Sequence, residues 1–374
     1  MQTTPMEWFG MEAPIFAFSH CRDVVAAVSR NGGFGVLGTT RSTVEELEID
    51  LNWLDEHSLG QPFGVDIMFP SKAPKEFESL TSEEAKRLIP QEHVAFVNEL
   101  VKAHGLPEST PEENDAFLKW YLEGRMRTYA EGEKRLEVVY KHPNVRMIVS
   151  ALGVPPQHQI ERAHNLGLKV AALVGHPKHV KAHKAAGMDM LMATGYEAGG
   201  HTGDIASFVL TPQIVDEAAP IPVLHGGGVG RGRQIAAAMA LGAQGVWTGS
   251  IWLGTVESEM TPLEREMLFA ANSGDTVRTR SGSGKPVRRL RGGFVQAWER
   301  EGAPKPLPMP LQSILVEETF KKMEKYQPRS LLSPPAGQVI GMMHHETNVR
   351  SVIYDMMLEF GETIESLSAL VSER

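Results

Sequence analysis

A short glycine-rich turn carries the residues with the clearest potential for chemistry. Residues 193–203 contain four glycines and His201, and they follow the apolar run Met188–Met192. Glycine lets backbone approach a ligand closely or adopt positive φ, and histidine can gain or lose a proton near neutral pH. A strand that ends in such a turn is typical of an active-site rim. We therefore expect His201 to be a general base or acid, with a purely structural histidine as the alternative.

Two further glycine turns have the form of phosphate-binding loops. Residues 225–233 include Gly227 and Gly228 and lead into a helix that is expected to begin near Gly232. Thr248-Gly249-Ser250 follows the next strand-like run. Backbone N–H groups in a turn before a helix N-terminus attract anions. In eight-stranded α/β barrels, the loops after strands seven and eight form the common phosphate site. The alternative is that these glycines only make tight turns.

Other polar residues have weaker claims. Asp66 ends the third strand-like run, where it could bond the polar edge of a ring or a ribityl hydroxyl, or merely cap a turn. His179 and His183 have the i, i+4 spacing of a metal-binding pair, but lysines interleave with them and no carboxylate completes a site. We expect a solvated basic helix there and no metal site. His344 and His345 are expected to lie on the surface of the tail.

Strand-like and helix-like segments alternate along the chain, which favours parallel pairing and an α/β fold. Eight such strands predict a (β/α)8 TIM barrel, and an open doubly wound sheet is the competing fold. The expected strands are Pro14–Phe18, Phe34–Leu37, Phe63–Met68, Met147–Leu152, Val170–Val174, Met188–Ala193, Pro222–Leu224 and Val246–Ile251. The expected helices between them are Arg22–Asn31, Thr43–His57, Gln157–Leu166, Pro177–Ala186, Pro212–Ala218 and Gly232–Leu241.

Two regions exceed a minimal barrel, which we expect to occupy residues 1–255. Residues 70–145 form an insertion after the third strand, in which Thr81–Glu84 and Thr110–Glu113 have the form of capping boxes. The insertion is thus expected to contain at least two amphipathic helices that serve packing or dimerisation, with a lid as the alternative. Residues 256–374 form a C-terminal extension that packs on the barrel, with helices near 311–325 and 347–371. Its Arg-rich stretch, 278–293, is expected to be a surface loop or a subunit contact.

Bulk composition narrows the class of protein. The net charge of −9 over 374 residues argues against nucleic-acid binding and against general attraction to anionic membranes. Cys21 is the only cysteine, so an intramolecular disulfide framework is excluded and a reducing cytoplasm is expected. No long apolar run predicts a signal peptide or a membrane-spanning helix.

The residues described so far resemble the nitronate monooxygenase family, formerly called 2-nitropropane dioxygenases. This family of flavoenzymes also includes flavin-dependent enoyl-ACP reductases and NADH:quinone reductases. Gly195-Tyr196-Glu197-Ala198-Gly199-Gly200-His201-Thr202-Gly203 is similar to the family pattern G-x-E-A-G-G-H-x-G. Residues 26–35, both phosphate-type turns and Pro335-Ala336-Gly337-Gln338 are also similar. The chain departs from the family where Asp66 replaces a common Asn and where Thr194 replaces a frequent Gln.

The resemblance implies a TIM barrel that holds FMN non-covalently. The phosphate would sit at Gly227, Gly228, Gly249 and Ser250, and the isoalloxazine would lie against the backbone of Phe16–Phe18. His201 would act as base or acid beside the flavin N5. The residues expected to bind FMN are Ala17, Phe18, Asp66, Ser150, Thr194, Gly199, Gly200, Gly227, Gly228, Thr248, Gly249 and Ser250.

The resemblance leads to three functional hypotheses. The first is an FMN-dependent monooxygenase that oxidises alkyl nitronates or nitroalkanes with O₂ to a carbonyl compound and nitrite. The second is an NAD(P)H-dependent reductase of an enoyl thioester or quinone, in which the Arg278–Arg291 stretch could bind a coenzyme A or carrier phosphate. The third is a non-catalytic flavin- or metabolite-binding barrel. The expected partners are a small-molecule substrate and O₂, and the insertion and tail make a homodimer a reasonable expectation.

Overall fold

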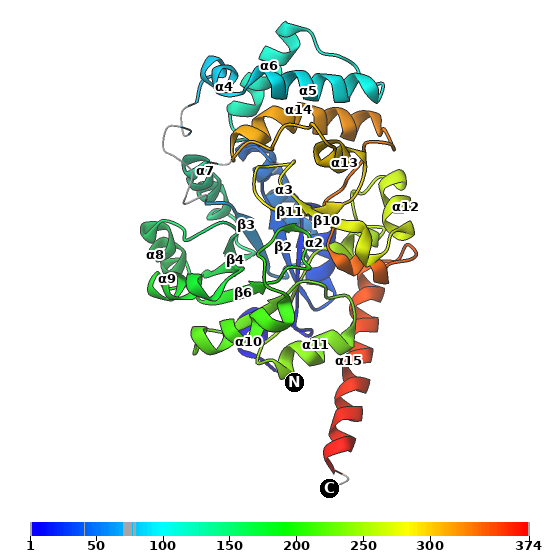
Figure 1. Ribbon diagram of the computed structural model, residues 1–374. Coiled ribbons are helices and arrows are strands. Elements are labelled where there is room, and N and C mark those ends of the chain that lie inside the picture. The colour runs from blue at the N-terminus through cyan, green and yellow to red at the C-terminus, as the bar shows by residue number, and fades with distance from the viewer. Residues whose placement is uncertain (1, 41, 70–76, 78–79, 127, 373–374) are drawn as a thin grey trace.

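The computed structural model describes residues 2–40, 42–69, 77, 80–126 and 128–372. Eight parallel strands form a closed barrel, so the predicted (β/α)8 architecture is confirmed (Figure 1). In spatial order the strands are β1 (Ile15–Ser19), β2 (Phe34–Gly38), β3 (Phe63–Ile67), β4 (Val145–Ser150), β5 (Lys169–Val174), β6 (Met190–Thr194), β8 (Val223–Gly226) and β9 (Val246–Thr248). Pairing of β1 with both β2 and β9 closes the ring.

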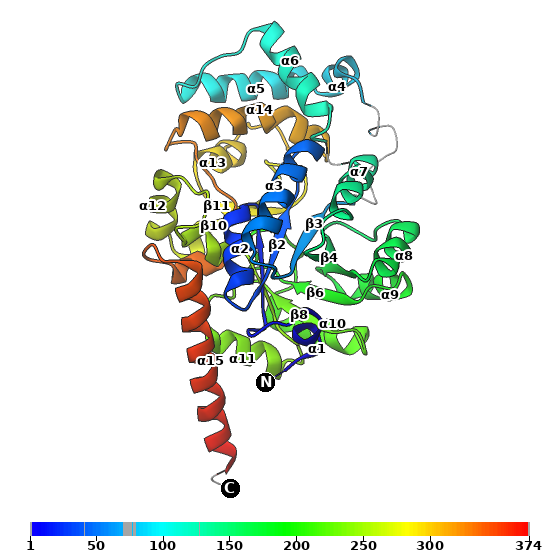
Figure 2. The ribbon, with the colours of Figure 1, turned by 180° about the vertical axis from the view of Figure 1, so that it is seen from behind.

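Alternation along the strands separates an interior from an outer surface. Side chains of alternate residues, among them Phe16, Phe34, Met147 and Trp247, fill the barrel interior. The short helix α1 (Thr4–Phe9) packs against the amino ends of the strands, where the Phe9 ring lies 4.3 Å from that of Phe34 (Figure 2). With that end plugged, the mouth at the carboxyl ends of the strands is the opening that remains for a ligand.

An outer ring of helices covers the barrel. It comprises α2 (Arg22–Arg30), α3 (Val44–His57), α7 (Tyr129–Val139), α8 (Gln157–Asn165), η2 (Pro177–His179), α9 (Val180–Ala185), α10 (Ser207–Ala218) and α11 (Gly232–Ala240). The expected helix at Pro212 instead begins five residues earlier, and Pro212 lies inside it. The reason is local, because the Glu197 carboxylate accepts hydrogen bonds from the Ser207 backbone N–H and hydroxyl and so caps the earlier start.

The insertion packs with the tail as a second layer (Figure 1). Its helices are α4 (Ser82–Leu88), α5 (Gln91–Ala103) and α6 (Pro111–Leu122), and both predicted capping boxes form. Their apolar faces share two clusters with α13 (Gly293–Glu299) and α14 (Leu311–Tyr326) of the tail. Most of the 70–79 part of the insertion lies outside the described residues.

The rest of the tail returns to the barrel. It contains η3 (Ser250–Gly254), α12 (Pro262–Ala270), η4 (Ser273–Asp275), β10 (Thr276–Thr279), β11 (Val287–Leu290), η5 (Gln338–Met342) and α15 (Val349–Ser372). β10 and β11 form a small antiparallel sheet with β7 (Gly200–His201). The expectation that 278–293 is a surface loop is therefore wrong, since Arg288 is only 1% exposed. Its guanidinium donates to the carbonyl of Tyr196 and to Thr276, which offsets the cost of burying it.

Candidate active site

Asp66 is the most unusual polar group at the barrel mouth. Val65 and Ile67 pack into the outer cluster, so the alternation of β3 turns Asp66 towards the barrel interior. The residue is 4% exposed, and its Oδ1 has no hydrogen-bond partner among the described residues. Burial alone raises the pKa of Asp66 to about 8. This carboxyl group is thus largely neutral at pH 7 and caps no turn, because only the backbone carbonyl of Asp66 accepts from Thr39.

The two phosphate-type turns keep open backbone donors. Gly227 and Gly228 have φ of 118° and 70°, the left-handed region that favours glycine. Within the described part of the chain, the N–H groups of Gly227, Gly228, Gly249 and Ser250 donate to no protein acceptor. A Cβ at Gly249 would find only the Phe18 carbonyl oxygen nearby, at 3.9 Å. These turns can therefore accept an anion.

The N-terminus of helix α11 differs from this expectation, because the chain fills it with its own groups. The side-chain carbonyl of Gln234 accepts from the N–H groups of Gly230 and Arg231. Oε2 of Glu359, on α15, accepts from the Gly232 N–H at 2.7 Å. The prediction that this helix end contributes to an anion site is therefore wrong, and any phosphate must rely on the glycine turns.

The carboxylate of Glu359 joins α15 to the start of α11 by several hydrogen bonds. Arg231 Nη2 and Arg233 Nε donate to its Oε1 at 2.9 and 2.6 Å. Burial would raise the pKa of Glu359, but the hydrogen bonds from the two arginines outweigh that effect and hold the pKa at about 2. A Cβ at Gly232 would lie 2.0 Å from the Met356 carbonyl oxygen, which shows how closely α15 approaches α11.

His201 lies on β7, which pairs with Val287 and Arg288 of β11. Its Nε2 is 3.0 Å from the hydroxyl oxygen of Ser283, a buried tail residue. Ser283 was not identified from the sequence, because its contact with His201 joins residues 82 apart. The half-buried imidazole thus has one nitrogen oriented by the tail, an arrangement suited to a positioned base or acid.

The remaining residues of the 195–203 turn have mainly structural partners. Glu197 caps α10 through Ser207, so its carboxylate serves the fold. A Cβ at Gly199 would lie 2.7 Å from the Gly337 nitrogen and 2.8 Å from Ser250 Oγ, so the tail requires a glycine there. Gly200 has φ of 73° and open space where a side chain would project. Of these two glycines, only Gly200 leaves room for a ligand.

Two arginines and an aromatic ring hold the base of the same turn. The guanidinium carbons of Arg288 and Arg278 lie 4.5 and 5.0 Å from the centre of the Tyr196 ring. Arg278 also pairs with Asp204 at 2.6 Å, and Arg289 donates to the Ser333 carbonyl. Most cations of the Arg-rich stretch thus have partners within the chain, which weakens the idea that they receive a carrier phosphate.

The other predicted cofactor residues fall into two groups, according to whether their side chains face the barrel interior or its outer surface. Phe18 and Thr194 share the alternation of the interior residues Phe16 and Met192 and so face the mouth. Ser150 and Thr248 face outwards: Ser150 Oγ donates to the Gly153 carbonyl, and Thr248 Oγ1 donates to the Phe16 carbonyl. Ala17, between two paired strands, offers only backbone. Ser150 and Thr248 would therefore shape the mouth instead of touching a cofactor with their side chains.

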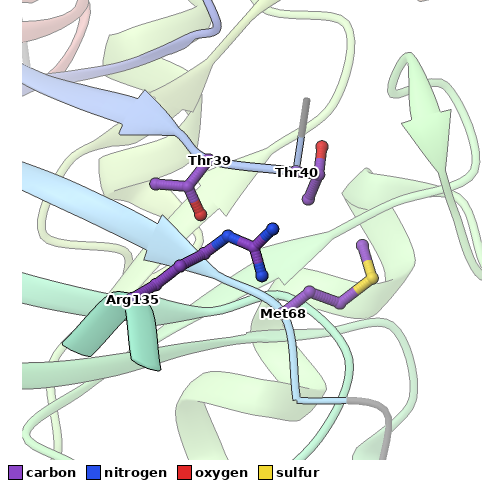
Figure 3. Close-up of a pocket in the computed structure, with 4 residues that line it drawn as sticks. All are labelled: Thr39, Thr40, Met68 and Arg135. Carbon is purple, nitrogen blue, oxygen red and sulfur yellow. The ribbon is translucent and has the colours of Figure 1, made fainter. Parts of the chain in front are cut away.

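A small hollow lies at the rim between β2, β3 and α7 (Figure 3). Thr39, Thr40, Met68 and Arg135 surround it, and its volume is about 10 Å³. That volume is near the minimum for one water molecule. Arg135 Nη2 donates to the carbonyls of Ser42 and Gly124, so this arginine fastens loops at the mouth.

The remaining histidines show how burial alters the sequence-based expectations. No group of metal ligands occurs among the described residues, His179 and His183 included. His183 is buried, unlike a residue of a solvated helix, and burial lowers its pKa to about 4. His225 bonds Thr211 at 2.7 Å, and burial lowers its pKa. His344 and His345 are exposed, as expected.

A closed parallel α/β barrel with polar groups gathered at the carboxyl ends of its strands is the architecture of barrel enzymes. A sequence model described as "Nitronate monooxygenase" matches residues 11–359. The chain therefore belongs to the nitronate monooxygenase family, which makes it an oxidoreductase of that flavoenzyme family.

Individual relatives agree with this assignment. The chain is 45% identical to "Putative monooxygenase Rv1533" of Mycobacterium tuberculosis over 99% of its length and 100% of that protein. It is 30% identical to "Probable nitronate monooxygenase" of Staphylococcus haemolyticus, with 82% and 81% covered. Among solved structures, nitroalkane oxidase from Streptomyces ansochromogenes is similar with a TM-score of 0.79 and 25% identity, over 97% and 99% of the two chains. FabK from Thermotoga maritima is similar with a TM-score of 0.73 and 25% identity, over 99% of each chain. No helix in the described part of the chain has the length and apolarity to cross a membrane.

Proposed function

We propose that this protein is an FMN-dependent nitronate monooxygenase, which oxidises alkyl nitronates or nitroalkanes with O₂ to a carbonyl compound and nitrite. The observation that carries the proposal is the mouth itself, where a buried carboxyl oxygen and a set of backbone donors, all without partners among the described residues, face the same end of the barrel. The family assignment and the similarity to a nitroalkane oxidase support the same reaction class.

The residues at the mouth fit FMN on physical grounds. The N–H groups of Gly227, Gly228, Gly249 and Ser250 would hold the phosphate, because they have no other acceptor in the described chain. The backbone from Phe16 to Phe18 would support the ring system. Asp66, largely neutral at pH 7, can donate one hydrogen bond and accept another, as an asparagine amide would in the same place. The Asp in this chain can therefore serve where the family commonly has Asn.

His201 would act on the substrate. Acidic protons next to a nitro group need a base that stands within hydrogen-bond reach, and the contact with Ser283 fixes the imidazole at the mouth. With a nitronate as substrate, a protonated His201 would instead bind its negative oxygen atoms. When bound, the flavin would supply the electron transfer from the substrate and the reaction with O₂. The apolar residues below the mouth, such as Trp247 and Phe18, would limit access of water.

A reductase that uses NAD(P)H to reduce an enoyl thioester or quinone is the second candidate. The similarity to FabK, at a TM-score of 0.73, favours keeping it. The structure provides less support for a coenzyme A or carrier phosphate at the Arg-rich stretch, because Arg278, Arg288 and Arg289 bond groups within the chain.

Anaerobic mixing distinguishes the two candidates. The flavin-loaded protein is mixed separately with an alkyl nitronate, NADH and NADPH, and the visible absorbance of the flavin is followed. Bleaching by the nitronate but not by either pyridine nucleotide is the expected result. Bleaching by a pyridine nucleotide with none by the nitronate would overturn the proposal in favour of the reductase. A protein that cannot bind FMN would overturn both. A bound flavin that none of the three reagents bleaches would favour a non-catalytic barrel, and full turnover by His201→Ala would overturn the role proposed for His201.

A further inference from the structure

Helix α15 extends well beyond the body of the protein (Figures 1 and 2). Its first half packs against α11 and α2, where Ile353, Met356 and Phe360 are buried. From residue 361 onwards the helix leaves that support, and nearly every residue up to 370 is exposed. The match to the family model ends at residue 359, within α15.

The free end, residues 361–370, exposes several apolar side chains to solvent. Ile364, Leu367 and Leu370 are 39%, 49% and 66% exposed. On the first half of the same helix, Tyr354 and Leu358 point away from the body and are 66% and 51% exposed. A helical segment of about three turns without tertiary contacts is marginal in water. Both halves of α15 therefore present apolar surface that requires a cover.

One stripe along α15 joins these two halves. Tyr354, Met357, Gly361, Ile364 and Ser368 follow one another at spacings of three and four residues, the spacing of a helix-pairing seam. None of them is charged. The acidic Glu362 lies well away from the stripe around the helix, whereas Glu365 borders it. Gly361 stands at its centre, and a Cβ there would meet nothing within 4 Å. A glycine in mid-helix costs about 1 kcal/mol relative to alanine, so a close crossing is a physical reason to have one.

We propose that α15 pairs antiparallel with α15 of a second copy of this chain, with the two helices crossing at Gly361. A two-fold axis at Gly361 places Tyr354 level with Ser368 of the second copy, and Met357 between the levels of Ile364 and Ser366, next to Glu365. The pairing is isologous, the commonest arrangement among soluble oligomers. The free end of each helix then lies along the first half of the other, so that Leu367 and Leu370 gain the support of the second body.

Charge also favours the antiparallel arrangement. Arg350, exposed at the start of α15, would stand beside the C-terminal end of the other helix, where the helix dipole is negative. In a parallel pair, the two copies of Glu365, which borders the stripe, would stand at the same level. The contact lies at the opposite end of the molecule from the insertion and tail layer (Figure 1), so it leaves the barrel mouth accessible.

The oligomeric state provides the first test. Sedimentation velocity or light scattering should give twice the chain mass of 41.1 kDa for the wild type and a single chain mass for a protein that ends at Phe360. Ile364→Asp should weaken dimerisation at least about tenfold, since a charge would be buried in the seam. Ser366→Asp places the same charge on the outer side of the helix and should remain dimeric. FMN content should be unchanged in every variant, so the result is independent of the proposed reaction.

Disulfide trapping provides the test of direction. Chains carrying Tyr354→Cys and Ser368→Cys are mixed and oxidised, and cross-linking is expected only between the two different chains. In the antiparallel pair, two copies of residue 354 lie about 21 Å apart along the axis, too far for a disulfide. Native Cys21 does not interfere, because it is buried and burial raises its pKa to about 11.

Any one of the following outcomes would overturn the proposal. They are a monomeric wild type at tens of micromolar, a truncated chain that stays dimeric, and cross-linking of Tyr354→Cys with itself, which would indicate parallel helices. If truncation gives a monomer but the mixed cysteine chains do not cross-link, the free end docks elsewhere on the second copy and the pairing is wrong.

Discussion

Two carboxylates in this protein have opposite surroundings. Glu359 at the junction of α15 and α11 accepts hydrogen bonds from two arginines and a backbone N–H, and its pKa is held at about 2. Asp66 at the barrel mouth is buried with one oxygen that has no partner in the described chain, and its pKa is raised to about 8. The carboxylate of Glu359 is thus satisfied by groups of the protein alone. The carboxyl group of Asp66 leaves a buried polar requirement that an added ligand can meet, which is how a structural site and a binding site differ in energy.

The backbone donors show the same contrast. The N–H groups at the start of α11 are satisfied by Gln234 and Glu359, whereas those of Gly227, Gly228, Gly249 and Ser250 have no acceptor in the described chain. If this contrast identifies the cofactor site, substitutions at the residues whose N–H groups have no acceptor should reduce flavin affinity. Substitutions at the satisfied start of α11 should instead reduce the free energy of unfolding. Four predictions test this separation.

The largest effect on FMN affinity is expected for Gly228→Val. A β-branched residue at φ of 70° is strained by about 1–3 kcal/mol, and relief of that strain would turn the open N–H groups away from a phosphate. FMN affinity should fall by about 10- to 100-fold, as measured by fluorescence titration of the apoprotein. Gly10→Val is the matched control, since Gly10 has φ of 64° at the C-terminal end of α1. Equal losses of FMN affinity in both variants would break the contrast.

The next effect concerns Asp66→Asn in the flavin-free protein. Because the pKa of Asp66 is raised to about 8, the folded state holds a proton that the unfolded state releases near pH 4. Wild-type stability should therefore fall as pH rises from about 4 to 8, by about 1.4 kcal/mol for each step of one in pH, and Asp66→Asn should lack this fall. Urea unfolding across that pH range measures it. Parallel curves for the two proteins would show that Asp66 has a partner.

Glu359→Gln should have the opposite signature. Loss of charged hydrogen bonds should cost about 1–3 kcal/mol at pH 7, with FMN affinity unchanged. Because the pKa of Glu359 is lowered to about 2, its stabilisation is present above the unfolded value near 4.3 and is lost as pH falls through about 2. The variant should therefore be less sensitive to acid than the wild type. Exposed Glu362→Gln, one turn away, should change neither property.

The smallest effect is expected at Ser283, whose hydroxyl orients His201. Ser283→Ala should lower turnover by about tenfold or less and shift the pH profile of kcat, while FMN affinity stays the same. Ser283→Thr, which keeps the hydroxyl, should restore both. If the alanine variant instead lost FMN in proportion to activity, Ser283 would belong to the cofactor site and not to the positioning of the histidine.

Local patterns in the sequence were sufficient to predict the barrel. Periods of apolar residues located all eight strands, and Thr81–Glu84 and Thr110–Glu113 located two helices, because each signal depends on neighbours a few residues apart. The three glycine turns were also visible locally. Their roles in binding FMN remain predictions, as does the role of His201.

Several errors arose where distant segments meet. The Arg-rich stretch 278–293 looked solvated because charged side chains are rarely buried, yet Arg288 is enclosed by bonds to Tyr196, 92 residues away. The sequence near Gly232 does not predict that the start of α11 is bonded by Glu359, which lies 127 residues further along the chain. Similarly, Gly199 is small because Gly337 and Ser250 pack against it. Such contacts depend on the tertiary fold and produce no periodic pattern in the sequence.

The contact of the tail with the 195–203 turn also bears on how the protein is made. The glycine turn pairs with β11 and packs against Gly337, so its final shape depends on residues that leave the ribosome 86 to 138 positions later. A barrel of eight strands can collapse before that point, but the position of His201 is not fixed until the tail packs against the 195–203 turn. Contacts this far apart in sequence form late and slowly. If His201 acts as proposed, the nascent chain should pass through a folded yet inactive stage, and catalytic competence should appear only after residue 337 has left the ribosome.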